Sequence, residues 1–151
     1  MIDRASIKKR IQYHRTLSDA EGELILEEEK IEFSFLNEHL RKYILYRLHF
    51  DPAVEIDDDF NNLLKRSLEE AMSLHPDLLA EERAARSCDG ASTLVTKKAL
   101  LLQSIQRKFD IRLDAFKAVE GKTLTDISQV VWEAMEQHPA WKDKLVYSGN
   151  V

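Results

Sequence analysis

Residues 36–48 read LNEHLRKYILYRL and carry the clearest periodic pattern of the chain. Their apolar side chains recur at spacings of three and four, as in a helix that buries one face. The members of this apolar face are Leu36, Leu40, Tyr43 and Ile44. Pro52 follows soon after, and the residue before a proline is pushed out of the helical region. We therefore predict a helix over 36–48 that ends before Pro52.

Two more helices are predicted on either side of a central connection. The first runs from Asp57-Asp58-Asp59, whose carboxylates suit an N-cap, to His75-Pro76. The second covers residues 94–109, which place apolar side chains at helical spacing. Between them we expect a short helix within 77–86 and a turn at Asp89-Gly90.

The C-terminal part is predicted to hold one short element and one final helix. The short element lies around 111–119 and breaks at Gly121. The final helix begins at Thr123, because Thr123 and Asp126 have the spacing of a capping box. We expect it to end at Pro139, leaving only a polar tail to the C-terminus.

The N-terminal region is less regular. Residues 5–15 have helical spacing, with apolar side chains on one face and basic ones around the rest. The chain then becomes polar and acidic around Gly22, so we expect a loop or irregular segment over 17–29. Apolar and polar residues alternate over 31–35, which also suits a brief strand.

The two halves of the sequence resemble each other. When Phe50-Asp51 is aligned with Phe109-Asp110, apolar positions in the two preceding helices coincide without a gap. The later helices match at Glu70-Ala71-Met72 and Glu133-Ala134-Met135, and each of these is followed by a His-Pro pair. Because the match includes polar residues and a proline, we predict an internal duplication of one helical unit.

Composition supports an all-α fold built from small helical bundles. The chain has 151 residues, of which 44% are hydrophobic, and it contains only four Gly and three Pro. So few turn residues disfavour barrels and sandwiches with many tight turns. With the duplication, we expect an N-terminal helical unit over 1–76 and a C-terminal unit over 77–151, either separate or packed as one domain.

Charge and cysteine content disfavour several classes of function. Acidic and basic residues are mixed, with a net charge of −5, which describes an ordinary solvated surface rather than a nucleic-acid footprint. The single cysteine, Cys88, forms neither an internal disulfide nor a thiolate zinc site. No apolar run reaches the ~18 residues of a bilayer span, and the N-terminus opens no signal peptide. We expect a cytoplasmic protein that binds neither nucleic acid nor membranes.

No set of residues predicts an enzyme active site or a metal centre. His75 and His138 both precede prolines but have no ligand partner at helical spacing, and an imidazole suits a helix C-terminus without a metal. Asp57-Asp58-Asp59 lacks the glycine and distal glutamate of a calcium loop. Cys88 lies beside Asp89, and a neighbouring carboxylate does not activate a thiol. We therefore expect no catalytic residue and no metal site.

Residues 89–135, about a third of the chain, resemble the later part of an acyl carrier protein. Gly90-Ala91-Ser92-Thr93-Leu94 is similar to the Gly-Ala-Asp-Ser-Leu turn that opens the second helix of such carriers. Phe109-Asp110-Ile111 is similar to the end of that helix, and Thr123-Leu124-Thr125-Asp126 to the opening of the last one. The resemblance implies a small helical bundle whose serine carries a phosphopantetheine arm.

Departures from the family pattern change what this resemblance implies. Thr93 stands where the carriers have the modified serine, and Ser92 is the nearest serine, one position early. Phe109 also lies two residues further from the turn than the family spacing places it. Carriers present an acidic second helix to basic enzymes, whereas this segment is basic, so its partner must differ. Its basic residues are Lys97, Lys98, Arg107 and Lys108.

The sequence thus predicts a non-catalytic, carrier-like accessory or adaptor protein that has lost the phosphopantetheine arm. Proteins that are similar to carriers but lack the serine are associated with bacterial peptide-maturation gene clusters, so the expected partner is a biosynthetic or maturation enzyme. One alternative is a functional acyl or peptidyl carrier modified at Ser92. The other is a generic helical interaction or regulatory module with an exposed aromatic patch, although such aromatics more often pack in a core. The patch would contain Phe33, Phe35, Trp132 and Trp141.

Overall fold

A computed structural model of the chain describes residues 4–74 and 93–147. Its elements are α1 (Arg4–Glu27), β1 (Ile31–Glu32), α2 (Phe33–Arg47), α3 (Phe60–Leu74), α5 (Thr93–Phe109), α6 (Ala115–Glu120), α7 (Leu124–Glu136), α8 (Pro139–Lys142) and β2 (Leu145–Val146). The all-α class is confirmed, since the described residues are mostly helical and β1 and β2 form only a short pairing. The short helix expected within 77–86 and the turn at Asp89-Gly90 lie outside the described residues.

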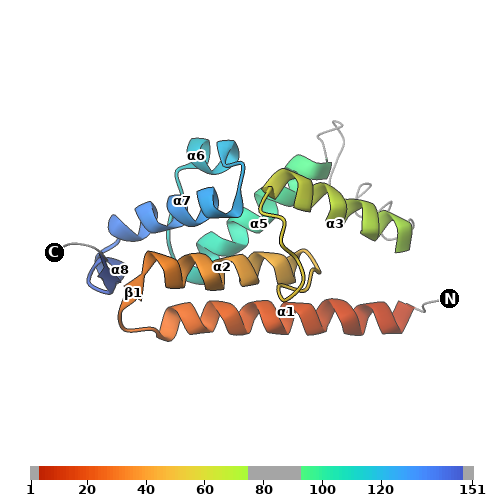
Figure 1. Ribbon diagram of the computed structural model, residues 1–151, viewed down its shortest axis with the longest axis horizontal. Coiled ribbons are helices and arrows are strands. Elements are labelled where there is room, and N and C mark those ends of the chain that lie inside the picture. Colours follow the sequence, from red (N-terminus) through yellow and green to blue (C-terminus); the bar gives the residue numbers. More distant parts are fainter. Residues whose placement is uncertain (1–3, 75–92, 148–151) are drawn as a thin grey trace.

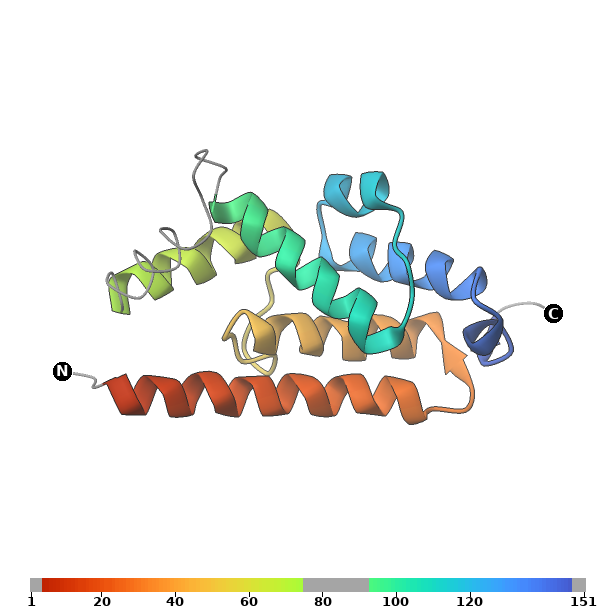
Figure 2. The same cartoon turned by 180° about the vertical axis from the view of Figure 1, so that it is seen from behind.

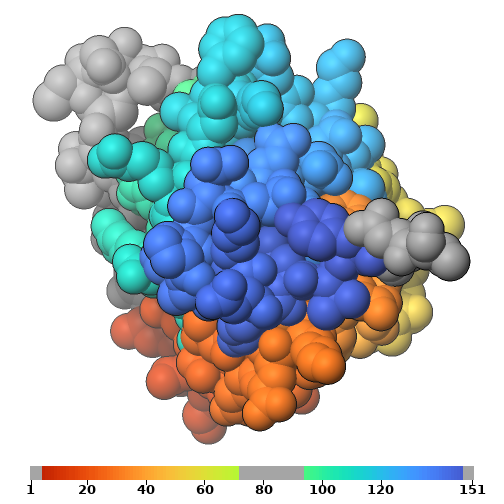
Figure 3. Space-filling model, turned by 90° about the vertical axis from the view of Figure 1, so that its left-hand side faces the viewer, coloured from red at the N-terminus to blue at the C-terminus, as the bar shows by residue number. Residues whose placement is uncertain are grey.

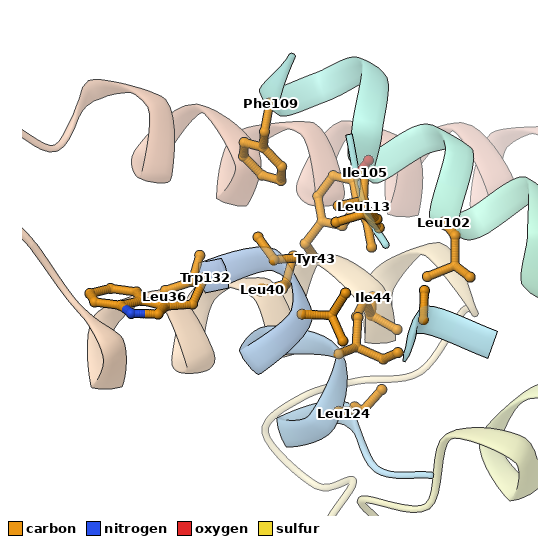
Figure 4. Packing of buried hydrophobic residues seen from close by; sticks show 14 of the residues in the cluster. Leu36, Leu40, Tyr43, Ile44, Leu102, Ile105, Phe109, Leu113, Leu124 and Trp132 are labelled. Atoms are coloured by element: carbon orange, nitrogen blue, oxygen red, sulfur yellow. The ribbon is translucent and has the colours of Figure 1, made fainter. Parts of the chain in front are cut away.

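The helix α2 lies at the centre of the molecule. It packs against α1 along one side and against α7 on another, as Figures 1 and 2 show. The predicted apolar face of α2 is confirmed, because all four of its side chains are fully buried. Figure 4 shows these side chains meeting others from α5 and α7. Buried side chains from both halves of the sequence form a single hydrophobic cluster.

The N-terminal helix is longer than the sequence predicts. The loop expected over 17–29 is wrong, since α1 continues to Glu27. Gly22 is buried within this helix, and a Cβ atom there would lie 2.7 Å from Cε of Lys108 on α5. Ser18 is also buried and donates a hydrogen bond to the carbonyl of Tyr43 at 3.0 Å. The small and polar residues of this segment therefore allow close packing against α2 and α5.

The helices α3 and α7 begin side by side. The N–H of Phe60 donates to the carbonyl of Lys122 at 2.8 Å, and the N–H of Leu124 donates to the carbonyl of Asp58 at 2.9 Å. Both predicted helix starts are confirmed. Asp59 accepts from the N–H of Asn62 at 2.8 Å, and Thr123 forms a complete capping box with Asp126. From this meeting point, α3 packs against α5, and α7 packs against α2.

The helices α2 and α5 have similar C-terminal ends, but not at the positions aligned in the sequence. His49 and Asp110 both have positive φ, of 68° and 51°. The next N–H then bonds the carbonyl five residues back, from Phe50 to Leu45 at 2.8 Å and from Ile111 to Gln106 at 3.1 Å. This geometry pairs Phe50 with Ile111. The structural pairing therefore differs by two residues from the sequence alignment, which placed Phe50 opposite Phe109.

The two aligned phenylalanines also lie in different surroundings. Phe109 is 1% exposed and lies against the rings of Tyr43 and Trp141, whereas Phe50 is only partly buried beneath the guanidinium of Arg66. Moreover, the aligned helices do not pair within their own halves, because α2 packs mainly against α1 and α7, and α3 packs against α5. We expected each half to form the same small bundle from its own helices. The observed packing of α2, α3, α5 and α7 differs from this expectation.

The polar C-terminal tail is a second incorrect prediction. Pro139 begins the short helix α8, whose Trp141 is 5% exposed and donates from Nε1 to the carbonyl of Phe109 at 2.8 Å. Leu145 of β2 is buried and pairs in parallel with Ile31 of β1. The alternative of a brief strand is thus observed for two residues, while Phe33 already belongs to α2. Figure 3 shows this C-terminal segment, in blue, beside the orange start of α2.

Replacing Trp141 tests whether the tail is part of the core. We expect Trp141→Phe to lower the free energy of unfolding by about 1–2 kcal/mol, because it leaves the carbonyl of Phe109 without its donor. Trp141→Ala should cost about 3–5 kcal/mol, because it also removes a buried ring. The matched control is Tyr147→Phe, whose hydroxyl bonds Glu136 at the surface. Urea unfolding followed by circular dichroism measures all three, and losses no larger than that of the control would contradict the packing described.

Candidate functional site

The start of α5 is where the sequence places the attachment serine of a carrier. Thr93 is the first residue of α5, so the helix begins at the turn that resembles the carrier motif. Ser92 immediately precedes it and lies outside the described residues, as do His75 and Cys88. The structure therefore supports the position of the predicted helix and gives no geometry for its serine.

Lys98 links α5 to two neighbouring elements. Its Nζ donates to the carbonyls of Val119 at 2.9 Å and Gly121 at 3.2 Å, and to Oδ1 of Asn61 at 3.2 Å. It also lies 5.1 Å from the centre of the Phe60 ring. Desolvation lowers the pKa of this ammonium group. Lys98 therefore holds the end of α6 against α5 and the start of α3.

Some of the basic side chains of α5 bind other groups of the same chain. Besides Lys98, Lys108 donates from Nζ to Oε1 of Glu23 on α1 at 2.6 Å. Arg107 is exposed at the opposite end of the helix from Lys98. Since Lys98 and Lys108 bind internal groups, α5 presents less positive charge to a partner than its sequence indicates.

Three exposed apolar side chains lie on α5 and α6, which the Lys98 side chain connects. We define the α5–α6 patch as Val95, Phe116 and Val119, which are 63%, 72% and 64% exposed. Val95 lies one helical turn before Lys98, and Lys98 bonds the carbonyl of Val119. In Figure 2, α6 lies above α7 and to the right of the first half of α5. Large apolar side chains that are exposed to solvent are candidates for a binding surface.

The helix α6 packs on the core through Ala118, the one buried residue of this helix. Ala118 is 2% exposed, whereas Phe116 and Val119 are directed outward. Asp114 caps the helix by accepting from the N–H of Lys117 at 3.1 Å, and Gly121 follows its last turn. Sequence reasoning placed a short element here but missed its exposed side chains. Six residues are too few for periodicity to distinguish a buried face from an exposed one.

The aromatic patch proposed for a generic interaction module is not at the surface. Trp132 and Trp141 are 6% and 5% exposed, and Phe33 packs edge-on against Trp132 with ring centres 5.8 Å apart. Core packing of the tryptophans is therefore confirmed. Phe35 is half-buried and stacks beside His39, with ring centres 4.4 Å apart.

The histidines and the aspartate run have structural contacts. His138 follows α7 and accepts at Nδ1 from the N–H of Ala140 at 3.2 Å, so it caps the start of α8 rather than the end of α7. In the aspartate run, Asp57 accepts from Asn62 at 2.6 Å and Asp59 is an N-cap, which is the predicted capping role. Among residues 4–74 and 93–147, no group of three His, Cys, Asp or Glu is arranged to hold a metal.

Two histidines meet between α1 and the end of α2. The Nδ1 atoms of His14 and His49 lie 3.0 Å apart, and the ring centres 5.2 Å apart. Burial lowers the pKa of His49 to about 4, and nearby basic groups act in the same direction. Burial and Arg10 also lower the pKa of His14, against opposing effects of Glu70 and Asp51. Both imidazoles are therefore neutral at pH 7, and one Nδ1–H can donate to the other Nδ1.

Comparison with known proteins adds no family to this description. No model of a known protein family, no curated protein and no solved structure matches the chain. In the described part of the chain, no helix has the length and apolar character needed to cross a membrane.

The histidine pair predicts a specific dependence of stability on pH. The unfolded chain takes up a proton near pH 6.5, whereas folded His49 stays neutral to about pH 4, so the unfolded state binds more protons between these values. We therefore expect His49 to lower the free energy of unfolding by about 2 kcal/mol as the pH falls from about 6.5 to about 4.5. Urea unfolding at each pH measures this change.

The matched variant is His49→Asn, because asparagine tolerates the positive φ at this position but does not titrate. It should remove most of the loss of stability in this pH window. Carboxylates with lowered pKa, such as Glu55 and Asp57, affect stability mainly below the window. Equal pH dependence in the wild type and the variant would show that His49 is not held neutral.

Proposed function

We propose that this chain is a non-catalytic, acyl carrier-like adaptor without a phosphopantetheine arm, and that it binds a biosynthetic enzyme through the α5–α6 patch. The class of pathway is bacterial peptide modification, by analogy with carrier-like proteins that lack the serine. The observation that carries the proposal is the exposure of Val95, Phe116 and Val119 on helices that are held in place.

The patch has the properties of a preorganised binding surface. Burying a valine or phenylalanine side chain contributes about 1.5–3 kcal/mol, so a partner that covers the patch gains substantial apolar contact. The cap at Asp114 and the bonds from Lys98 already fix α6, which lowers the entropy that binding must overcome. An aromatic side chain such as Phe116, with smaller apolar neighbours, is a typical centre of such an interface.

The order of elements supports a carrier-like C-terminal half. The long helix α5, the short helix α6 and the capped helix α7 follow one another as the resemblance to carriers implies. The meeting of α3 and α7 supports an ancestral duplication, because their N-caps, Asp59 and Thr123, pair across an antiparallel bridge. In that duplication each half contributes a helix, a connector and a second helix. The loss of the arm is supported by Thr93, which stands at the serine position.

Binding to a biosynthetic enzyme encoded by a neighbouring gene tests the adaptor proposal. The double change Phe116→Ser and Val119→Ser should weaken the complex at least tenfold, because it removes most of the apolar surface that the enzyme covers. The matched control is Leu24→Ser on α1, a side chain that is 47% exposed and far from this patch in the sequence. Titration calorimetry gives the affinities. Equal affinities for both variants would place the interface elsewhere.

A functional carrier modified at Ser92 is the alternative, and it is favoured by one observation. Ser92 immediately precedes the first residue of α5, close to where carriers hold the arm at the start of a helix. Incubation with a phosphopantetheinyl transferase and coenzyme A, followed by mass spectrometry, separates the two proposals. We expect the mass to stay unchanged while a standard carrier is modified in the same tube. An arm that appears on the wild type and is absent from Ser92→Ala would replace the adaptor proposal.

A further inference from the structure

The connector between α2 and α3 is a tightly held loop, which we call the acidic loop (residues 51–59). Arg41 donates to the carbonyls of Glu55 at 2.7 Å and Asp57 at 3.1 Å, the two residues that flank Ile56. The guanidinium of Arg66 donates two hydrogen bonds to the carboxylate of Glu55, of 3.0 and 2.7 Å. The backbone on both sides of Ile56 is therefore fixed.

This fixed backbone holds two apolar side chains in solvent. Ile56 is 93% exposed and Val54 is 74% exposed, the two highest values among the large hydrophobic residues of the described chain. The N–H of Val54 donates to the carbonyl of Asp51 at 3.1 Å, so its position is also set by the loop. A rigid loop that presents an isoleucine has little ordering entropy to lose on binding.

The charge around these side chains is strongly negative. Five of the nine residues of the acidic loop are acidic. Arg41 pairs with Asp58 at 3.3 Å, and Arg66 pairs with Glu55 and Asp57 at 2.7 and 3.6 Å. Two arginines therefore offset part of a charge of −5, and the loop and its arginines together carry −3. A surface that covers Ile56 must be positively charged around its apolar centre.

Such a surface exists on α1 of this chain, which we call the basic segment (residues 4–15). It contains five basic residues and no acidic one. Arg10 pairs with Glu70 at 3.3 Å, whereas no described acidic residue pairs with Lys8 or Lys9. Two apolar side chains lie exposed among these charges, Ile11 at 38% and Tyr13 at 63%. The basic segment therefore offers positive charge and apolar contact that complement those of the acidic loop.

We propose that the acidic loop of one copy docks on the basic segment of a second copy. Ile56 and Val54 pack against Ile11 and Tyr13, and the opposite charges around them orient the two copies. We call this contact head-to-tail, because it joins the acidic loop of one copy to the basic segment of another. It closes reciprocally in a twofold dimer, closes into a larger ring or extends into a longer chain. It uses neither Ser92 nor the α5–α6 patch, so it stands apart from the proposed adaptor function.

Sedimentation of the full chain tests the contact directly. At 50 mM NaCl, the mean mass of the wild type should rise with protein concentration. At 500 mM NaCl the association should weaken at least tenfold, because salt screens the attraction between the exposed charges. A mass that stays that of the monomer at low salt and high concentration would overturn the proposal, as would association that salt does not change.

Complementary variants test the head-to-tail geometry. Ile56→Ser keeps the basic segment intact, and the double change Ile11→Ser, Tyr13→Ser keeps the acidic loop intact. Each should be monomeric alone, but an equimolar mixture should form a one-to-one dimer, because one intact contact remains between them. Val54→Ser is a second loop variant, and circular dichroism checks that all of them fold.

Val119→Ser is the matched control, since it removes a side chain that is 64% exposed, close to the 63% of Tyr13, from the α5–α6 patch and should associate like the wild type. A mixture that stays monomeric would reject the head-to-tail contact, as would Ile56→Ser that associates as strongly as the wild type. Loss of association in Val119→Ser alone would assign self-association to the α5–α6 patch and also overturn the proposal. None of these results depends on whether an enzyme partner exists.

Discussion

The structure depends on the burial of α2 on more than one side. Tyr43, Ile44 and Leu45 are consecutive in the sequence and all are fully buried. Consecutive residues point around a helix at about 100° intervals, so no single neighbour can cover all three. They need α1 on one side and elements of the C-terminal half on the other. The two halves of the chain are therefore joined in one hydrophobic cluster, and α7 packs against α2 rather than against α5.

This dependence explains which elements could be predicted from the sequence. The helices α2, α3, α5 and α7 carry local signals, namely a regular apolar face and, for α3 and α7, the caps Asp59 and Thr123. The second half of α1 has no such signal, because Gly22 normally indicates a break and here allows close contact with Lys108. Likewise, Trp141 packs against Phe109, which lies 32 residues away and whose carbonyl accepts its N–H. Contacts between residues that are distant in the sequence determine the structure at both places. The periodicity of the sequence gives no information about such contacts.

In the candidate sites, too, local features could be predicted from the sequence, whereas features that depend on contacts between distant residues could not. The opening of α5 was predicted, as was the capping role of the aspartates, because both are local features of a helix start. The α5–α6 patch was not, since the exposure of Phe116 depends on Ala118 being the residue that meets the core. The internal use of Lys98 was also missed, because its acceptors belong to α3, to α6 and to the residue that follows α6. A basic residue in a sequence shows a charge but not the group that it binds.

The two connectors of the fold share one design. The segment before α3 presents Val54 and Ile56, and the segment before α7 presents Phe116 and Val119. A basic residue from the preceding long helix donates to backbone carbonyls in each, Arg41 in the first and Lys98 in the second. Both segments then lead into the bridge at which α3 and α7 begin.

Because the buried faces of the helices are needed to enclose α2, binding surfaces are left to the outer faces of the helices and to the connectors, which are held by the helices and open to solvent. Exposed apolar residues at these two places are therefore compatible with a stable core. Two connectors of different charge, one acidic and one close to the basic face of α5, can bind different partners without changing the core.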